Sequence, residues 1–259
     1  MFKNLVLISF ISLPIASENL LDIYNEALDN DPQYKSSEYS LLAGKEFVVQ
    51  GRAGLLPNVT LSGSTNWNEY YQFDELQSSY NNNSVTARLT QPLFRLDSWF
   101  NFKRSKKLTD ASEADFAYAQ QNLIIRTVEK YFGVLRAIDN LNAAISEEKA
   151  IKKQLDQIQQ RFEVGLSAIT EVQEAQLAYD LSLAAKIRSE GALFNAREEL
   201  NSLIGREIFS VDSLKADIVP ENPNPTTKQE WVDIALKNNY RLQASVLRRD
   251  ASQDSARSS

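Results

Sequence analysis

The sequence predicts a mainly α-helical protein that also carries one pair of antiparallel β-strands. One observation is a long segment almost free of helix-breaking residues, since no proline occurs between Leu93 and Val219. A segment of this kind, rich in Ala, Gln, Glu, Leu and Lys, is typical of long helices. The other observation is an earlier segment in which apolar and polar residues alternate. This two-residue period is typical of a half-buried strand.

Composition excludes several classes of protein. The chain has 259 residues, 28 basic and 34 acidic side chains, a net charge of −6, and neither histidine nor cysteine. This length corresponds to one or two domains. The two absences exclude Cys/His zinc sites, thiol nucleophiles and imidazole-based triads, whereas carboxylate or serine–lysine chemistry stays open. Because no convergent acid–base set is visible, we expect no enzyme, no cofactor and no bound metal.

Residues 1–17 have the features of a secretory signal peptide. Lys3 precedes an apolar run, Leu5–Ala16, and the small residue Ser17 precedes Glu18. A positive start, a short apolar segment and a small-residue exit define such a signal. The run is also shorter than the ~20 residues of a transmembrane helix. The alternative is a buried N-terminal helix.

Residues 18–53 are predicted to form two helices. Apolar residues recur at helical spacing after Glu18, and Asp31-Pro32 ends that pattern. The second helix is expected to run from Pro32 to Ala53.

Two strands are predicted within residues 57–94, over Val59–Trp67 and Ser84–Leu93. Each has one apolar and one polar face, and a polar external loop containing Asn81–Asn83 is expected to separate them. Two such strands leave unpaired edges, which only closure with further strands removes in lipid. We therefore expect the two strands to form part of the wall of a membrane β-barrel, with Trp67 and Trp99 at the two membrane–water interfaces. A soluble sheet packed on helices is the alternative, in which both tryptophans are core residues.

Residues 97–205 are predicted to form a long helical hairpin. Its first helix would span ~100 Å and end at Gly165, and its second would span ~50 Å and end at Gly205. The tip is placed at residues 165–169, and a capping box of Thr170 and Gln173 is expected to start the second helix. Because the arms differ in length, helix 32–53 is expected to cover part of the longer one. The apolar seam of the first helix is read from residues spaced by three and four: Ile124, Val128, Tyr131, Leu135, Ile138 and Ile145.

The C-terminal residues repeat the N-terminal ones. Ile234–Asn239 resembles Glu26–Asp31 at an offset of 208 residues, after a proline-containing linker at residues 206–226. Residues 227–259 are interpreted as the start of a second repeat, which Ser259 truncates.

The chain resembles the TolC family of outer-membrane efflux proteins over Glu18–Ser259. The stretches that carry the resemblance are Leu55–Pro57, Gln91–Phe94, Tyr131–Asp139, Gln154–Gln157 and Arg161–Val172. The Val-Gly-Leu turn in the last of these is the most specific. The resemblance implies that this chain is roughly half of a protomer. It also implies a homotrimer with a β-barrel in the outer membrane and a helical tunnel across the periplasm.

The resemblance further implies site residues and partners. A periplasmic adaptor would dock on the hairpin tip at Val164, Gly165, Leu166, Ser167 and Thr170. An inner-membrane pump would supply the energy for export. Thr170 and Glu171 would take part in closing the tunnel entrance, although family members have aspartate where this chain has Glu171. On the residues alone, the alternative is that Gly165 is merely a helix stop.

The sequence therefore predicts a passive exit duct for efflux or type I secretion. The alternative is a periplasmic coiled-coil adaptor or scaffold without a pore. A basic cluster at Lys103, Arg104, Lys106 and Lys107 is interpreted as a solvated face or as a contact with outer-membrane lipid head groups. The acidic net charge argues against a nucleic-acid partner.

Overall fold

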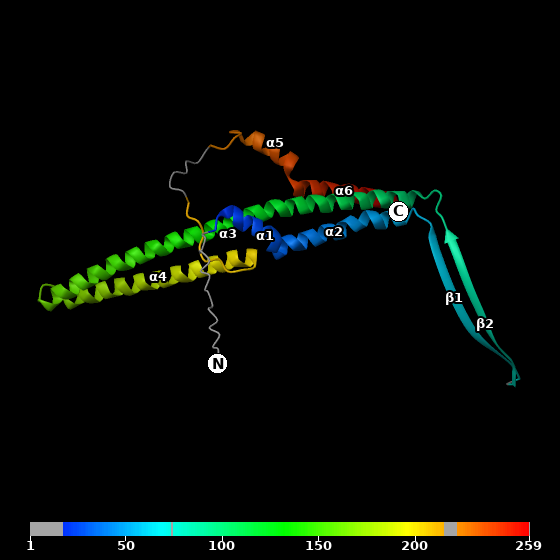
Figure 1. Ribbon diagram of the computed structural model, residues 1–259, viewed down its shortest axis with the longest axis horizontal. Helices are drawn as coiled ribbons and strands as arrows, with labels where there is room; N and C mark the ends of the chain where they lie inside the picture. Colours follow the sequence, from blue (N-terminus) through cyan, green and yellow to red (C-terminus); the bar gives the residue numbers. More distant parts are fainter. Residues whose placement is uncertain (1–17, 74, 215–221, 259) are drawn as a thin grey trace, which may run out of the picture. The chain divides into compact units, whose positions relative to one another are not determined.

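The structure is a computed structural model that describes residues 18–73, 75–214 and 222–258. The predicted signal peptide and residues 215–221 of the predicted linker lie outside these ranges. The elements in chain order are α1 (Leu20–Asn30), α2 (Pro32–Ala53), β1 (Asn58–Gln72), β2 (Glu75–Thr90), α3 (Leu96–Glu163), α4 (Ile169–Ile204), α5 (Lys228–Asn238) and α6 (Tyr240–Ser258) (Figure 1). The predicted fold class, long helices with one antiparallel strand pair, is confirmed.

The chain divides into two compact units. Unit 1 comprises Met1–Ser36 and Ala119–Thr226, and unit 2 comprises Ser37–Tyr118 and Thr227–Ser259. Within the described ranges, none of the helices combines the length and the apolar character that crossing a membrane requires.

The core of unit 1 lies where α1 and the C-terminal part of α4 pack on α3. Its fully buried side chains include Ile23 of α1, Leu123 of α3 and Leu200 of α4. The predicted seam of α3 is wrong at its N-terminal end, because Ile124 is 48% exposed and Leu123 is completely buried. Leu123 belongs to the same buried cluster as Ile23 of α1, a partner that spacing within α3 alone cannot reveal.

Glu18, which precedes α1, is bonded to the segment that follows α4. Glu18 forms a parallel β-bridge with Val211, and the Tyr131 hydroxyl donates to the carbonyl of Asp212 at 2.9 Å. Arg206 binds the carboxylates of Glu26 at 2.6 Å and Glu18 at 2.8 Å. The hydrogen bonds that Arg206 donates, to Glu26 first and then to Glu18, raise the pKa of Arg206 above its usual value. Burial, followed by the charge of Asp212, raises the pKa of Tyr131.

In unit 2, α2 packs closely on α3 through small residues. This contact was expected because the two helices of the hairpin differ in length. A Cβ on Gly44 would lie 2.4 Å from the Cβ of Ser112, and the Thr109 hydroxyl donates to the Gly44 carbonyl at 2.9 Å. Helix α6 also binds α3, since Lys107 Nζ lies 2.9 Å from the buried Asp254 carboxylate. The hydrogen bond from Lys107 holds the pKa of Asp254 below its usual value. The basic cluster is thus partly used for packing between helices.

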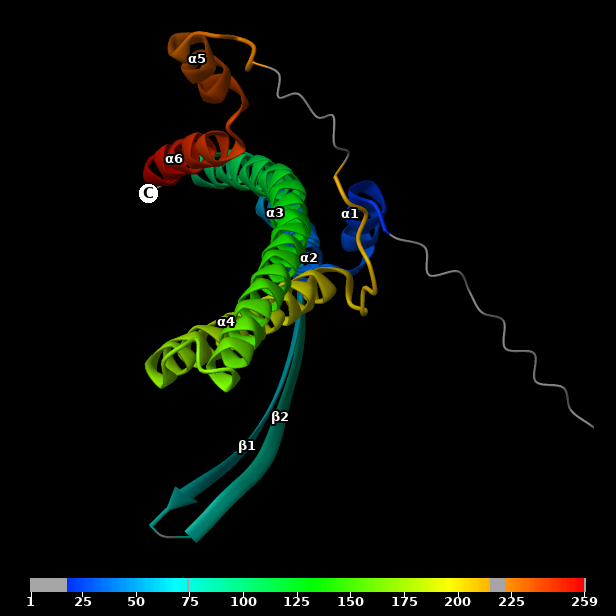
Figure 2. The same cartoon turned by 90° about the vertical axis from the view of Figure 1, so that its left-hand side faces the viewer.

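The strand pair is longer than predicted, and the predicted polar loop is wrong. β1 and β2 run side by side in opposite directions (Figure 2). They pair from Asn58↔Thr90 to Gln72↔Glu75, with a bulge at Tyr70/Tyr71. Asn81–Asn83 therefore belong to β2, because cross-strand bonds such as Thr65 Oγ1 to Asn81 Oδ1, 2.9 Å, outweigh the low strand propensity of asparagine. β2 ends at Thr90 rather than Leu93 because Pro92 cannot donate to a ladder.

The internal repeat has a structural counterpart. Helices α1 and α5 have 11 residues each, and the residue after each, Asp31 or Asn239, bonds back to the alanine four residues earlier. The same side chains accept a hydrogen bond from the first turn of the next helix, Asp31 from Tyr34 at 2.8 Å and Asn239 from Leu242 at 3.1 Å. All of these positions differ by 208, which supports the interpretation of residues 227–259 as the start of a second repeat.

Candidate functional site

The tip of the α3–α4 hairpin is a rigid turn that exposes apolar side chains. Gly165 has φ +77°, its N–H donates to the Phe162 carbonyl at 2.9 Å, and the N–H of Leu166 donates to the Arg161 carbonyl at 2.8 Å. This pair of bonds is the Schellman motif, which satisfies the last carbonyls of a helix. Val164 and Leu166 are about 70% exposed, at 69% and 70%.

The second half of the tip differs from the prediction. Helix α4 begins at Ile169 with Ala168 as its N-cap, and no side chain caps it. The predicted capping box of Thr170 and Gln173 is therefore wrong, because both residues already lie inside the helix. The Ser167 hydroxyl instead donates to the Glu171 carboxylate. That bond keeps Ser167 and Glu171 together at the positive end of the helix, which favours the carboxylate.

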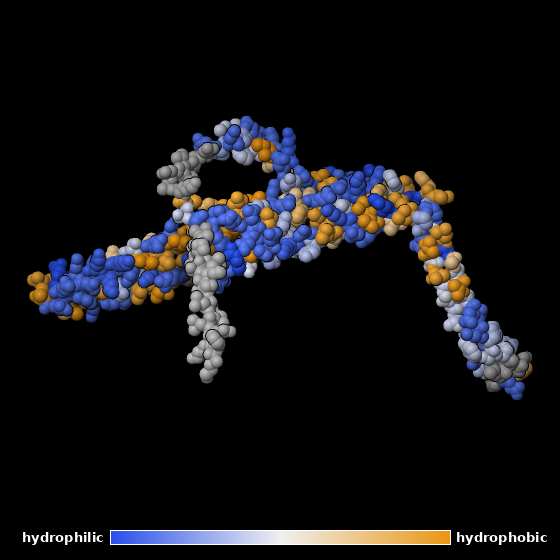
Figure 3. All heavy atoms as spheres, in the orientation of Figure 1, coloured by the Kyte–Doolittle hydropathy of each residue, from blue (hydrophilic) through white to orange (hydrophobic). Residues whose placement is uncertain are grey.

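The tip thus combines exposed apolar side chains with a fixed backbone. Hydrophobic atoms gather at this end of the hairpin (Figure 3). The site residues predicted from the sequence lie in two adjoining segments: Val164, Gly165, Leu166 and Ser167 in the turn between the helices, and Thr170 and Glu171 in the first turn of α4. Such a turn presents a preformed surface, which reduces the entropy lost on docking.

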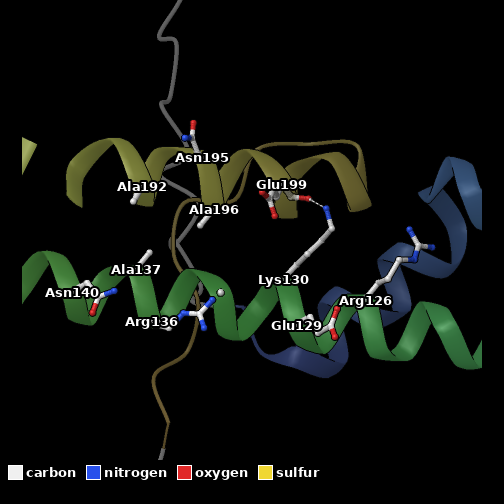
Figure 4. Close-up of a pocket in the computed structure, with 11 residues that line it drawn as sticks. Arg126, Glu129, Lys130, Arg136, Ala137, Asn140, Ala192, Asn195, Ala196 and Glu199 are labelled. Carbon is white, nitrogen blue, oxygen red and sulfur yellow. Dashed lines mark hydrogen bonds between the residues drawn. The ribbon is translucent and has the colours of Figure 1, made fainter. Parts of the chain in front are cut away.

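A groove between α3 and α4 was not predicted. It has a volume of about 510 Å³ and is floored by small residues, Gly133, Ala137, Ala192 and Ala196. Lys130 reaches across it from α3, and its Nζ donates to the Glu199 carbonyl of α4 at 2.8 Å (Figure 4). The small residues of the two helices face each other only because of the relative rotation of α3 and α4, so the sequence carried no direct signal for this groove.

The strand pair forms a second candidate surface, with two chemically distinct faces. Residues paired across an antiparallel ladder share a face, so the register assigns each side chain. Over the rungs next to the helices, one face is apolar and consists of Val59, Leu61, Gly63, Val85, Ala87 and Leu89. The other face is polar and consists of Thr60, Ser62, Ser64, Asn66, Asn82, Ser84, Thr86 and Arg88.

The apolar face has no partner within the described part of the chain. Val59, Leu61 and Val85 are each more than 70% exposed. Hydrophobic residues of the strand pair lie on the part nearer the helices (Figure 3). A contiguous exposed apolar surface of this kind marks a protein or membrane interface. Among residues 18–73, 75–214 and 222–258, no group of three or more acidic side chains is placed to hold a metal ion.

Comparisons with known proteins give the family. Residues 23–206 match the family described as "Outer membrane efflux protein". The chain is 33% identical over 244 residues to outer membrane protein TolC of Vibrio cholerae serotype O1, covering 94% of this chain and 55% of that protein. It is 29% identical over 233 residues to the alkaline protease secretion protein AprF of Pseudomonas aeruginosa, covering 86% of this chain and 48% of that protein.

The fold is shared with a solved outer-membrane channel. The Campylobacter jejuni CmeC outer membrane channel superposes with a TM-score of 0.76 at 19% identity, covering 92% of this chain and 52% of that one. The chain spans about half the length of the relatives it matches. The family is one of efflux proteins rather than of enzymes, and the matches give no support to a scaffold without a pore. The chain belongs to the outer membrane efflux protein family.

Proposed function

We propose that this chain is part of an exit duct in the outer membrane that exports molecules passively through a periplasmic helical tunnel. Three copies form the duct, and the strands of all copies close one β-barrel. Efflux or type I secretion is the process it serves, consistent with the matches to TolC and to the protease secretion protein AprF. The duct itself performs no chemistry and binds no cofactor.

The two faces of the strand pair carry this proposal. A ribbon that is apolar on one side and polar on the other fits a barrel wall between lipid and water. Two strands alone cannot close, because each edge leaves backbone groups that lipid cannot satisfy. Further copies of the ribbon remove both edges.

We propose the hairpin tip as the contact with a periplasmic adaptor, which links the duct to an inner-membrane pump. Leu166 and Val164 offer exposed apolar area, and Gly165 fixes the turn. Thr170 and Glu171 are proposed to help close the entrance, with Ser167 holding the Glu171 carboxylate.

Cross-linking tests the tip. Because residues 1–259 contain no cysteine, Leu166→Cys adds a single attachment point within them. A photo-activated cross-linker there should capture the adaptor in cells that express the gene encoding this sequence. The matched control is Leu181→Cys on α4, which is 60% exposed and lies away from the turn. Equal capture from both positions would contradict the assignment.

Export complementation provides the functional test. Leu166→Ser removes apolar area, and Gly165→Ala forces a side chain into the left-handed region at about 1–2 kcal/mol. Cells that carry either variant should lose drug resistance, while trimer formation and the amount of the variant in the outer membrane stay normal. Normal resistance in these cells would refute the docking role of the tip. Absence of the wild-type protein from the outer membrane would refute the barrel.

A further inference from the structure

The N-terminal part of α3 is held from two opposite sides in unit 2. On one side is α2, where a Cβ on Gly51 would lie 2.6 Å from the Cβ of Ser105. On the other is α6, where the Asp254 carboxylate lies 2.9 Å from Lys107 Nζ. Lys107 follows Ser105 by two residues, which is about 200° around a helix of 3.6 residues per turn. Helix α3 therefore lies between α2 and α6 (Figure 1).

Helices α2 and α6 are repeat counterparts, yet they bind α3 through different faces. Helix α2 uses Gly44, whose counterpart 208 residues later, Ser252 of α6, is exposed. Helix α6 uses Asp254, which is 2% exposed and whose counterpart in α2 is the exposed Glu46. A helix of this type therefore has two faces that can bind a helix of the α3 type.

The second of these faces is uncovered on α2, and we call it the outer face of α2. It consists of Tyr39, Ala43 and Glu46, the counterparts of Leu247, Ala251 and Asp254, together with the neighbouring Leu42. Tyr39 and Leu42 are 68% and 52% exposed. Within the described residues, Glu46 forms no ion pair. The face thus offers apolar area around one unpaired carboxylate.

The contact between α6 and α3 indicates which partner fits the outer face of α2. Asp254 binds Lys107, so the equivalent Glu46 requires a helix that presents a basic side chain at the position of Lys107. The α3 helix of this chain is already covered on both sides. The partner is therefore a helix of the α3 type from another repeat.

We propose that the outer face of α2 is a contact between copies, in which Glu46 pairs with the basic counterpart of Lys107 in the second repeat of the neighbouring copy. This inference rests on the proposed duct, whose copies must meet side by side to close a ring. Helices of the α2 and α3 types then alternate around that ring. Each carboxylate of the first type faces an ammonium or guanidinium of the second.

Cross-linking locates the contact in cells that express the gene encoding this sequence. A photo-activated cross-linker on Ala43→Cys should yield covalent dimers and trimers of this protein. Mass spectrometry should place the linked peptide in the helix that repeats α3. The matched control is Lys45→Cys, which is also exposed on α2 but points about 200° away and should yield no dimer.

Charge reversal tests the ion pair. Glu46→Lys should raise the protein concentration at which the detergent-purified trimer half-dissociates by about tenfold or more, because like charges facing each other across an interface repel. Glu46→Asp keeps the charge and should keep the trimer. Lys45→Glu changes a neighbouring charge outside the outer face and should also keep it. Light scattering after size-exclusion chromatography measures dissociation, and circular dichroism should show unchanged helix content in all three variants.

The contact and the duct fail in different ways. Cross-links from Ala43→Cys that stay within one chain or join a different protein would overturn the contact. Equal dissociation of wild type and Glu46→Lys would overturn the ion pair. Either result leaves the duct intact if the wild-type protein is a trimer in the outer membrane, whereas a monomeric wild type would overturn the duct itself.

Discussion

At the scale of single residues, Asp31 has two roles, a helix cap and an ion pair, of which its repeat counterpart Asn239 shares the cap. Both side chains accept a hydrogen bond from the first turn of the following helix. Asp31 is also 3% exposed and pairs with Arg126 at 2.5 Å. The ion pair explains why the first repeat has a carboxylate where an amide suffices in the second.

We expect Asp31→Ala to lower the free energy of unfolding by about 2–3 kcal/mol, because it removes a cap and leaves Arg126 half-buried without its partner. Asn239→Ala removes only a cap and should cost about 1 kcal/mol. Guanidinium denaturation of the detergent-purified protein, followed by circular dichroism, measures both. Equal losses would show that the Arg126 pair adds nothing.

At the scale of elements, the approach of α2 to α3 depends on glycine. Gly44 and Gly51 leave no room for a Cβ, since Ser112 and Ser105 side-chain atoms lie 2.3–2.6 Å from where it would be. Gly133 in α3, by contrast, has open space around it. The same residue type thus serves close packing in unit 2 and borders an open groove in unit 1.

Gly44→Ala should therefore destabilise the protein by about 1–3 kcal/mol, because Ser112 is short and cannot swing away. Gly133→Ala is the control and should stabilise it by about 0.5–1 kcal/mol, since alanine is the better helix former. Thermal unfolding of both variants gives the comparison. A neutral Gly44→Ala would show that α2 and α3 separate easily.

At the scale of the whole molecule, the proposed barrel requires strands beyond this pair. Its apolar face is largely exposed in a single chain, and a lone two-stranded ribbon is marginally stable at best in water. Assembly and membrane insertion are therefore expected to be coupled.

Two neighbouring substitutions test which face meets lipid. Leu61→Arg places a charge on the apolar face and should reduce the outer-membrane level of the trimer, consistent with a cost of about 2–4 kcal/mol per copy. Ser62→Arg places the same charge on the polar face and should be tolerated. Quantitative immunoblots of outer-membrane fractions measure both. If Ser62→Arg lowered the outer-membrane level and Leu61→Arg did not, the polar face rather than the apolar face would be the one that meets lipid.

The sequence by itself determined the elements whose cause is local. The helix stops at Gly165 and Gly205 follow from left-handed backbone, with φ of +77° and +78°, and α2 has the predicted bounds. Alternation also gave the two faces of the strands, because side chains one residue apart point to opposite sides. The resemblance to the efflux family, for which the Val-Gly-Leu turn is the most specific of several stretches, is confirmed by the family match.

The tertiary structure decided features that depend on distant partners. Asn81–Asn83 lie in a strand because β1 offers a backbone ladder. Leu123 rather than Ile124 is buried, in a cluster that includes Ile23 of α1 and Leu200 of α4. The clamp of Arg206 on Glu18 and Glu26 joins residues about 180 positions apart, at separations of 188 and 180. Local periodicity records which side of an element is apolar, but which neighbour covers that side is set by packing between segments far apart in the chain.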